Sequence, residues 1–362
     1  MEDCFEKRGA KVYLFQKIAI PLPKNYTNFF LMRRILGIGN ALVDALVRVE
    51  DEAILRELNL PKGSMQHVDA ARHEAISERL QTLPMTMRTG GSACNTILAL
   101  GNLHARPGVV GKIGNDRNGW FFENTFREQG ITPHIIHSAT PTGVASTLIT
   151  PDGQRTFGTF LGAAAELKPE EIDERWFDGY DYLYIEGYLV QNHELIERIV
   201  NYAKGRGMKI GLDMASYNIV RSDREFFEHL LKKTDIVFAN EEEANAFSGG
   251  KSPRAALDDL ARYCEVAVVK IGKKGAMALS HGEFVRVPAR PVERVVDTTG
   301  AGDFFAAGFL YGHCLGNDLA ECVRKATVLA AYVIEVVGTK LSERTWESVR
   351  HEITPLRSFS DC

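Results

Sequence analysis

The chain has 362 residues, of which 45% are hydrophobic and 25% are charged, as in an ordinary globular protein. Its 43 basic and 47 acidic residues give a net charge of −4, which argues against a broad nucleic-acid-binding surface. No apolar run approaches the ~20 residues of a membrane span. The six cysteines are scattered without a C-x-x-C pair, so we interpret them as reduced thiols of a cytoplasmic protein. From the charge balance and the lack of a long apolar run, we expect neither membrane nor nucleic-acid partners.

Residues 1–32 show no clear hydrophobic period, and no small-residue cleavage site follows their apolar stretch. Met32 precedes two arginines and a first strand, so we expect it to be the natural start and residues 1–32 to be an extension outside the fold. The expected domain then spans residues 33–350, and residues 351–362 form a tail.

The first strand, expected at 35–38, leads into Gly39-Asn40-Ala41-Leu42-Val43-Asp44. Leu42 stands where a Rossmann fingerprint needs its third glycine or alanine, which opposes an NAD-dependent enzyme. Asn40 and Asp44 follow the carboxyl end of a strand, where open α/β sheets bind ligands. Turn chemistry for Asn40 and a solvated or capping Asp44 remain the alternative.

A second glycine cluster, Gly90-Gly91, precedes an apolar helical pattern at 96–103. Paired glycines before a helix allow a ligand to approach the backbone closely, and Asn95 lies in the first turn. The alternative is a tight turn with Ser92 as the helix N-cap.

Two segments predict a second, smaller sheet. Residues 142–150 and 155–161 flank the turn signal Pro151-Asp152-Gly153 and are expected to form a hairpin, and residues 45–49 are expected at an edge of this sheet.

Side chains of this hairpin have open roles. Phe157 and Phe160 should face opposite sides of their strand, with the interior of the small sheet as the simpler role for each. Arg155 is either a solvated turn residue or a charge partner for phosphate.

The rest of the chain alternates between strand-like and helix-like patterns, which predicts a doubly wound, mainly parallel sheet with helices on both faces. Further strands are expected at 109–113, 182–185, 209–212, 236–239, 266–271 and 276–280, and further helices at 51–60, 69–83, 120–129, 193–204, 223–232, 253–263 and 318–337.

Two polar segments follow strands of this sheet. Asn240 and Glu243 come directly after the strand at 236–239, and helix capping is the simpler interpretation of both. Lys270 lies near the end of the strand at 266–271, which leads into Gly272 and Gly275, a turn that an ordinary hairpin would also use.

The stretch from Asp297 to Leu310 carries the sharpest signal. Gly300, Ala301 and Gly302 leave backbone N–H groups uncovered where an apolar helix begins, and such a helix N-terminus binds anions. Asp303, in the first turn, could take a proton from an attacking hydroxyl. The alternative is a helix start in which the glycines serve packing and Asp303 complements the helix dipole.

Together these motifs resemble the PfkB (ribokinase-like) family of sugar and nucleoside kinases. Residues 297–310 resemble its C-terminal signature, residues 89–95 its N-terminal signature, and Gly39–Asp44 the adenosine-kinase-like branch. The resemblance covers residues 33–348 and implies a ribokinase-like α/β fold with a small β-sheet lid. It implies ATP- and Mg²⁺-dependent phosphorylation of a primary hydroxyl on a nucleoside or sugar.

Site roles follow by resemblance. Asp303 is the implied catalytic base, and Gly300, Ala301 and Gly302 form the implied anion hole. The implied substrate-binding residues are Asn40, Asp44, Gly90, Gly91 and Asn95. The nucleotide is implied at Asn240, Lys270, Gly272, Gly275, Thr298 and Gly338. Asn240 and Glu243 are implied to position Mg²⁺ through water, and Asp297 and Thr299, with the loop at Gly338 and Ser342, match a site for a monovalent cation such as K⁺.

The acceptor stays open at this level. An adenosine-kinase-like activity is favoured, with a fructokinase, ribokinase or ketodeoxygluconate kinase as the alternative. A non-catalytic nucleotide- or sugar-binding protein is a further alternative, although binding alone needs no acid at Asp303. Exposed edges of the lid sheet invite pairing, so a homodimer through the lid is an expectation.

Overall fold

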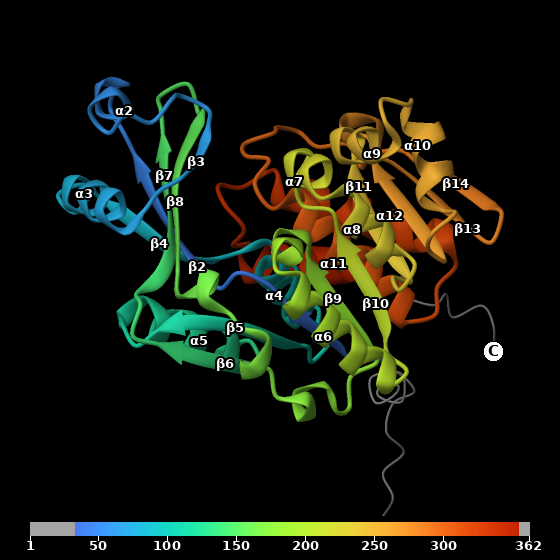
Figure 1. The fold of residues 1–362 in the computed structure, drawn as a ribbon. Coiled ribbons are helices and arrows are strands. Elements are labelled where there is room, and N and C mark those ends of the chain that lie inside the picture. The colour runs from blue at the N-terminus through green and yellow to red at the C-terminus, as the bar shows by residue number, and fades with distance from the viewer. Residues whose placement is uncertain (1–32, 355–362) are drawn as a thin grey trace, which may run out of the picture. The chain divides into compact units, whose positions relative to one another are not determined.

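The computed structural model describes residues 33–354 (Figure 1). The predicted extension at 1–32, the start at Met32 and most of the predicted tail lie outside these residues. None of the helices within 33–354 is both long and apolar enough to cross a membrane. The cysteines in this range, Cys94, Cys264, Cys314 and Cys322, are all free thiols.

A nine-stranded sheet forms the centre of the described chain, in the order β14-β13-β12-β11-β10-β9-β1-β5-β6. All neighbouring strands from β12 to β6 pair in parallel, and β13 and β14 add an antiparallel edge. The bounds are β1 (Ile35–Ile38), β5 (Gly108–Gly114), β6 (Thr132–Ser138), β9 (Tyr182–Glu186), β10 (Lys209–Asp213), β11 (Ile236–Asn240), β12 (Val266–Lys270), β13 (Ala276–Ser280) and β14 (Glu283–Val287).

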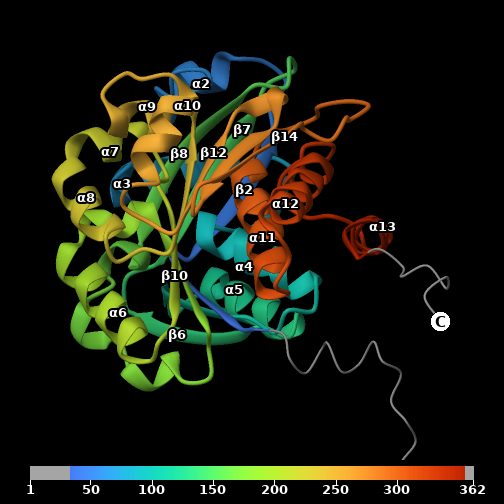
Figure 2. The ribbon, with the colours of Figure 1, turned by 90° about the vertical axis from the view of Figure 1, so that its right-hand side faces the viewer.

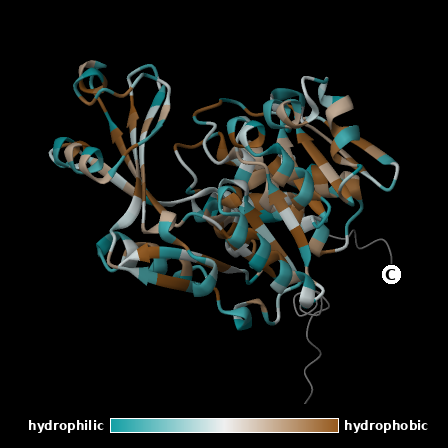
Figure 3. Ribbon diagram, viewed as in Figure 1, coloured by the Kyte–Doolittle hydropathy of each residue, from teal (hydrophilic) through white to brown (hydrophobic). Residues whose placement is uncertain are grey.

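The sequence of these strands explains their central position. β1, β9, β11 and β12 are nearly continuous apolar runs, which suits parallel strands buried on both faces. Figure 3 shows this sheet as mainly hydrophobic, with hydrophilic residues gathered on the surrounding helices.

Helices cover both faces of the large sheet, so the predicted doubly wound fold is confirmed (Figure 2). One face carries α6 (His193–Gly205), α7 (Tyr217–Ser222), α8 (Arg224–Leu231), α9 (Glu241–Ser248) and α10 (Pro253–Leu260), whose apolar side chains share one core with the strands. The other face carries α4 (Ser92–Asn102), α11 (Ala301–Cys314) and α12 (Leu319–Val333), with α13 (Glu343–Ile353) beside α12. Helix α5 (Arg117–Glu128) packs against β5 and β6.

The smaller sheet has five strands in the order β3-β8-β7-β2-β4. Their bounds are β2 (Leu42–Arg48), β3 (Met65–His67), β4 (Met85–Gly90), β7 (Thr142–Ile149) and β8 (Arg155–Gly162). The predicted β7–β8 hairpin is confirmed. The edge position predicted for 45–49 is wrong, because β2 lies between β7 and β4. The partner β4 shows no clear strand signal in the sequence, and the partner β7 lies about 100 residues further along the chain.

Helices α2 (Ala53–Glu57) and α3 (Ala70–Leu80) pack on one face of the small sheet. Phe160 belongs to that packed core and stacks on His73 with ring centroids 4.7 Å apart. Because side chains alternate along a strand, Phe157 and Arg155 lie on the opposite face, as does Asp44 of β2. The small sheet therefore has an apolar face under its helices and a polar face.

Two helix ends differ from the prediction. Helix α12 ends at Val333 rather than running on to residue 337, and a turn then leads to Gly338 at φ +72°. Helix α13 continues to Ile353, three residues into the segment predicted as a tail. Lys325 explains this end, because its buried ammonium donates to the Ile353 carbonyl.

Candidate active site

Polar residues stand at the carboxyl ends of five adjacent strands of the large sheet. Glu186, Asp213, Asn240 and Lys270 are the last residues of β9, β10, β11 and β12, and Asn40 follows β1 by two residues. Because parallel strands end at one edge, this sequence pattern gathers the side chains along a single line. The carboxyl edge predicted to carry the site is therefore lined with ionisable and amide groups.

Helix α11 begins at this edge. Gly300 is its N-cap and adopts φ +75°, a conformation that a side chain would strain. A Cβ built on Gly300 would also lie 2.5 Å from the Thr339 methyl group. Asp303 is the third residue of the helix, so its carboxylate shares the first turn with the unpaired backbone N–H groups.

The Asp303 carboxylate is held by the first turn of another helix, α4. Ser92 Oγ donates to Asp303 Oδ1 at 2.7 Å, and Asn95 Nδ2 donates to Oδ2 at 2.9 Å. The Thr96 hydroxyl donates to the Asp303 carbonyl at 3.1 Å. Burial raises the pKa of Asp303 to about 6, although the bonds from Ser92 and Asn95 oppose this shift.

The glycine pair before α4 fits the backbone of Asn40. Gly91 adopts φ +97°, and a Cβ there would lie 2.0 Å from the Asn40 carbonyl oxygen. Gly91 is the N-cap of α4, so the alternative in which Ser92 caps the helix is wrong. Ser92 instead uses its hydroxyl on Asp303.

Asp44 lies over the other glycine of the pair. A Cβ on Gly90 would come within 2.3 Å of Asp44 Oδ1, so the carboxylate occupies the space that a side chain would fill. Desolvation raises the pKa of Asp44 to about 7, and the nearby Asp303 charge adds to the shift. Asp44 thus lies within β2 and is partly buried, so it is neither a helix cap nor a fully solvated side chain.

Glu186 is a site residue that the sequence analysis missed. Its side chain is buried and accepts from Asn40 Nδ2 at 2.7 Å and from the Ala93 N–H at 3.0 Å. Desolvation raises its pKa to about 7. Its position at the end of β9 was the available signal, because the predicted strand stopped one residue earlier.

Arg88 is a second missed residue. It pairs in register with Asp44 across β4 and β2, and its Nε lies 3.8 Å from the position of a Cβ on Gly338. Within residues 33–354 this buried Nε has no hydrogen-bond partner. No periodicity in the sequence distinguished Arg88 from an ordinary exposed strand residue.

Asn240 and Glu243 form a complete capping box at the start of α9. The Glu243 N–H donates to Asn240 Oδ1 at 2.8 Å, and the Asn240 N–H donates to Glu243 Oε2 at 2.7 Å. Asn240 Nδ2 also donates to Glu243 Oε1 at 2.7 Å. The capping interpretation is therefore correct for both residues. Burial raises the pKa of Glu243 to about 7, with Lys270 acting against the shift.

Lys270 brings a positive charge to the start of α11. Its Nζ donates to Asp213 Oδ2 at 3.0 Å and lies 3.3 Å from the position of a Cβ on Gly302. Asp213 and Glu243 raise the pKa of Lys270 against its desolvation, so the ammonium stays charged. The glycines that follow, Gly272 and Gly275, both have positive φ and make a tight turn after β12.

Asp297 anchors the loop that precedes α11. Its carboxylate accepts from the Thr299 N–H at 3.0 Å and from the Gly338 N–H at 2.5 Å. It also forms an ion pair with Arg155, which donates to Thr299 Oγ1 at 3.0 Å. Arg155 is therefore not a solvated turn residue, and its role as a charge partner for phosphate stays a prediction. Thr298, by contrast, is exposed, and its carbonyl accepts the Ala301 N–H at 3.2 Å.

The oxygen atoms of the side chains at this edge decide whether the protein can bind Mg²⁺ directly. Within residues 33–354 no group of three or more histidine, cysteine or acidic side chains is arranged to hold a metal ion. Both carboxylate oxygens of Glu243 are already used by Asn240. These residues therefore form no protein cage for Mg²⁺, and the water-mediated contact predicted for Asn240 and Glu243 stays a prediction.

The structure brings most of the predicted residues to one edge. Hydrogen bonds, ion pairs or close approach connect Asn40, Asp44, Gly90, Gly91, Asn95, Lys270, Gly300, Gly302, Asp303, Asp297, Thr299 and Gly338. Glu243, which is hydrogen-bonded to Asn240, is close enough to Lys270 to raise its pKa, so this pair belongs to the same edge. Gly272 and Thr298 are exposed.

Comparison with known proteins identifies the family of this chain. Residues 64–346 match the model of the pfkB family carbohydrate kinases. The chain is 28% identical to adenosine kinase of Saccharomyces cerevisiae over 84% of this chain and 95% of that protein, and 26% identical to 5-dehydro-2-deoxygluconokinase of Bacillus subtilis over 75% and 89%. The crystal structure of adenosine kinase from Sinorhizobium meliloti superposes with a TM-score of 0.80 at 33% identity, covering 89% of this chain and 99% of that one. This protein belongs to the pfkB family of carbohydrate kinases and is a sugar or nucleoside kinase.

Proposed function

We propose that this kinase transfers the terminal phosphoryl group of ATP to a primary hydroxyl of a nucleoside, with adenosine as the first candidate. The observation that carries the proposal is the Asp303 carboxylate, held by Ser92 and Asn95 at the N-terminus of α11. An acid with a raised pKa beside uncovered backbone N–H groups is suited to general base catalysis of phosphoryl transfer.

In this proposal Asp303 takes the proton of the attacking hydroxyl. The N–H groups at Gly300, Ala301 and Gly302 and the Lys270 ammonium stabilise negative charge on the transferring group. The Ala301 N–H, which donates to the Thr298 carbonyl at 3.2 Å, exchanges that bond for one to the phosphoryl group. Asn240 and Glu243 position Mg²⁺ through water. When bound, Mg²⁺ supplies positive charge to the phosphate oxygens.

The acceptor is proposed to lie between the small sheet and the first turn of α4. Asn40, Asp44 and Asn95, with Gly90 and Gly91, grip its hydroxyls, and the glycines permit that approach because they add no side chain. The nucleotide lies along Asn240, Lys270, the turn at Gly272 and Gly275, Thr298 and Gly338. Similarity to the adenosine kinases of yeast and Sinorhizobium meliloti supports the nucleoside.

A free sugar is the second candidate, and one observation favours it. Glu186 is a buried carboxylate that interacts with Asp303, so with Asp44 this edge carries three carboxylates with raised pKa values, and three acceptors suit a polyhydroxylated substrate. Similarity to the 5-dehydro-2-deoxygluconokinase of Bacillus subtilis agrees with this alternative.

The test is ATP consumption with Mg²⁺ against adenosine, inosine, guanosine, ribose, fructose and 2-keto-3-deoxygluconate. Turnover of adenosine that disappears in Asp303→Asn is the expected result. Turnover with a free sugar only would replace the acceptor and keep the mechanism. If Asp303→Asn turned over the accepted substrate at the normal rate, Asp303 would be excluded as the base.

We also propose that two copies pair through the small sheet. Its edge strands β3 and β4 carry Met65 and Met85, which are 54% and 38% exposed. An exposed edge with apolar side chains favours pairing. Light scattering should give the mass of a dimer, and Met85→Lys should shift it to a monomer; a wild-type monomer at all concentrations would contradict this.

A further inference from the structure

Arg155 connects the small sheet to the loop that begins α11. It is the first residue of β8, and its guanidinium forms an ion pair with Asp297 and donates to Thr299 Oγ1 at 3.0 Å. The side chains of Arg155 and Asp297 are only 11% and 3% exposed, so water screens this pair weakly. The two residues are far apart in the chain and meet only through the fold.

The Asp297 carboxylate has its acceptor positions filled by the protein. Oδ1 accepts from the Thr299 N–H, and Oδ2 accepts from the Gly338 N–H and pairs with Arg155. Asp297 thereby ties the segment just before Gly300 to the loop after α12. The positive charge that this buried carboxylate needs comes from Arg155.

This arrangement does not fit the monovalent cation site that Asp297 and Thr299 are predicted to form. A K⁺ ion at the Asp297 carboxylate would lie beside a buried guanidinium, where like charges repel strongly because little water separates them. The Thr299 hydroxyl, a second expected ligand, also accepts from Arg155. The side chains that would face K⁺ are therefore already bound to a cation of the protein itself.

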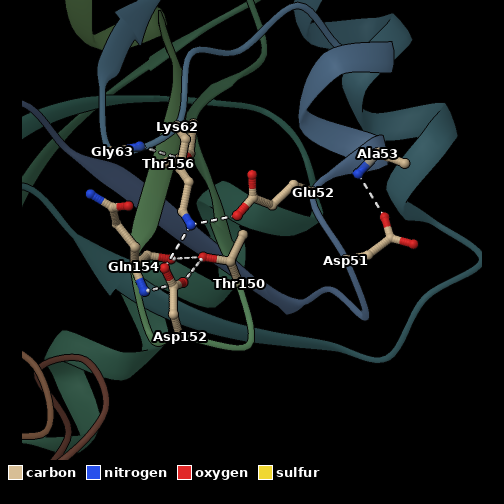
Figure 4. A network of polar contacts seen from close by, with 9 residues as sticks. All are labelled: Asp51, Glu52, Ala53, Lys62, Gly63, Thr150, Asp152, Gln154 and Thr156. Carbon is tan, nitrogen blue, oxygen red and sulfur yellow. Dashed lines mark hydrogen bonds and ion pairs between the residues drawn. The ribbon is translucent and has the colours of Figure 1, made fainter.

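Polar contacts connect the tip of the β7–β8 hairpin, next to Arg155 in the sequence, with the segment around Lys62 (Figure 4). Lys62 bridges Glu52 at 2.5 Å and Asp152 at 2.6 Å, and Asp152 accepts from the Thr150 hydroxyl and the Gln154 N–H. The Gly63 N–H donates to Thr156 Oγ1 at 3.0 Å, on the residue after Arg155. These contacts lie on both sides of Arg155 in the sequence and so lower the conformational entropy that the ion pair costs.

We propose that Arg155 is a positioning residue that replaces a monovalent cation at Asp297. It sets the Asp297–Gly300 loop and so the backbone N–H groups of α11, and the kinase needs no K⁺. This proposal uses the kinase activity of the family but not the identity of the acceptor.

The test compares KCl with choline chloride at constant ionic strength. Thermal unfolding of the protein without substrate, and ATP turnover with the accepted substrate, should be the same in both salts for the wild type. Arg155→Met should lower Tm and reduce kcat roughly tenfold or more, because the anion-binding loop loses its position. KCl, but not choline chloride, should restore part of both, whereas Arg155→Lys should remain independent of K⁺.

Arg79→Met is the matched control. Arg79 of α3 also forms an ion pair, with Glu57 of α2 at 2.8 Å. These two helices cover the apolar face of the small sheet, whereas Arg155 lies on the opposite face. Removal of the Arg79 charge should leave kcat and the response to K⁺ unchanged.

Three results would overturn the proposal. The first is a wild-type Tm or kcat that rises specifically with K⁺, which is measurable even if Arg155→Met does not fold. The second is an Arg155→Met enzyme with normal kcat. The third is an Arg155→Met enzyme that loses only affinity for ATP, without rescue by K⁺, which would assign Arg155 to the nucleotide phosphates. A failed acceptor assignment would leave the unfolding measurements interpretable.

Discussion

Asn95 donates its side-chain amide to the Asp303 carboxylate at 2.9 Å, although the two residues are 208 positions apart in the sequence. Each lies in the first turn of a helix, α4 or α11, and each follows a glycine with positive φ. The two glycine motifs are thus halves of one site. Thr339 Oγ1 donates to Asn95 Oδ1 at 3.3 Å and so fixes which end of the amide faces Asp303.

Asp303→Asn should lower kcat by roughly 10²–10⁴-fold while changing KM little, because the amide cannot take a proton from the acceptor. The fold should persist, since the new side chain keeps the size of the old one and can still bond Ser92. Steady-state kinetics with circular dichroism would check this. Ser92→Ala is the matched control: it removes one bond to Asp303 and should have a smaller effect on kcat.

The pH dependence of kcat/KM should show an acid limb with an apparent pKa between about 6 and about 7. Burial raises the pKa of Asp303 to about 6 and that of Asp44 to about 7, and both are expected to act as ionised acceptors. Activity should therefore fall about tenfold per pH unit between the two pKa values and about a hundredfold per unit below both, because both carboxylates must be ionised. Because the two carboxylates interact, the measured value belongs to the pair. An acid limb near pH 4, typical of exposed acids, would contradict the burial argument.

Asp44→Asn should increase stability at pH 8 and weaken acceptor binding. The folded-state pKa of Asp44, about 7, lies above the unfolded value, so the folded state holds a proton that the unfolded state has lost. The stabilisation from that proton is complete below pH 4 and is lost as pH rises through 7. The neutral amide avoids the loss, so the free energy of unfolding at pH 8 should rise by about 1–2 kcal/mol.

Urea unfolding at pH 5 and pH 8 would measure this difference. Glu78→Gln, at an exposed position on α3, is the control and should change neither value. A variant of Asp44 that is equally destabilised at both pH values would show that packing, and not the ionised carboxylate, decides the outcome.

Lys270→Met should raise KM for ATP and destabilise the fold more at pH 8 than at pH 6. The change leaves Asp213 and Glu243 near each other without their cation, and breaking a buried pair costs about 3–5 kcal/mol. Lower pH relieves that cost because Glu243, with a pKa of about 7, can take up a proton. Lys274→Met, in the exposed turn after Lys270, should leave stability and KM for ATP near wild-type values.

The sequence by itself determined the layered fold and the two glycine-flanked helix starts at the candidate site. Continuous apolar strands such as 236–239, alternating with amphipathic helices, leave a parallel sheet covered on both faces as the stable arrangement. The glycines at 90, 91, 300 and 302 marked the two helix starts, where Gly91 and Gly300 have positive φ and a side chain would meet a neighbouring atom. These features are local, so a local pattern is enough to recognise them.

Only the tertiary structure decided which charges meet. The pairing of Arg155 with Asp297, the pairing of β2 with β7 and the bond from Asn40 to the unpredicted Glu186 all join segments more than 90 residues apart. A sequence pattern carries burial and period but no information on partners at that separation. Which side chains contact each other depends on the strand order and on the packing of α4 against α11. Both are set by the cooperative burial of the whole hydrophobic core.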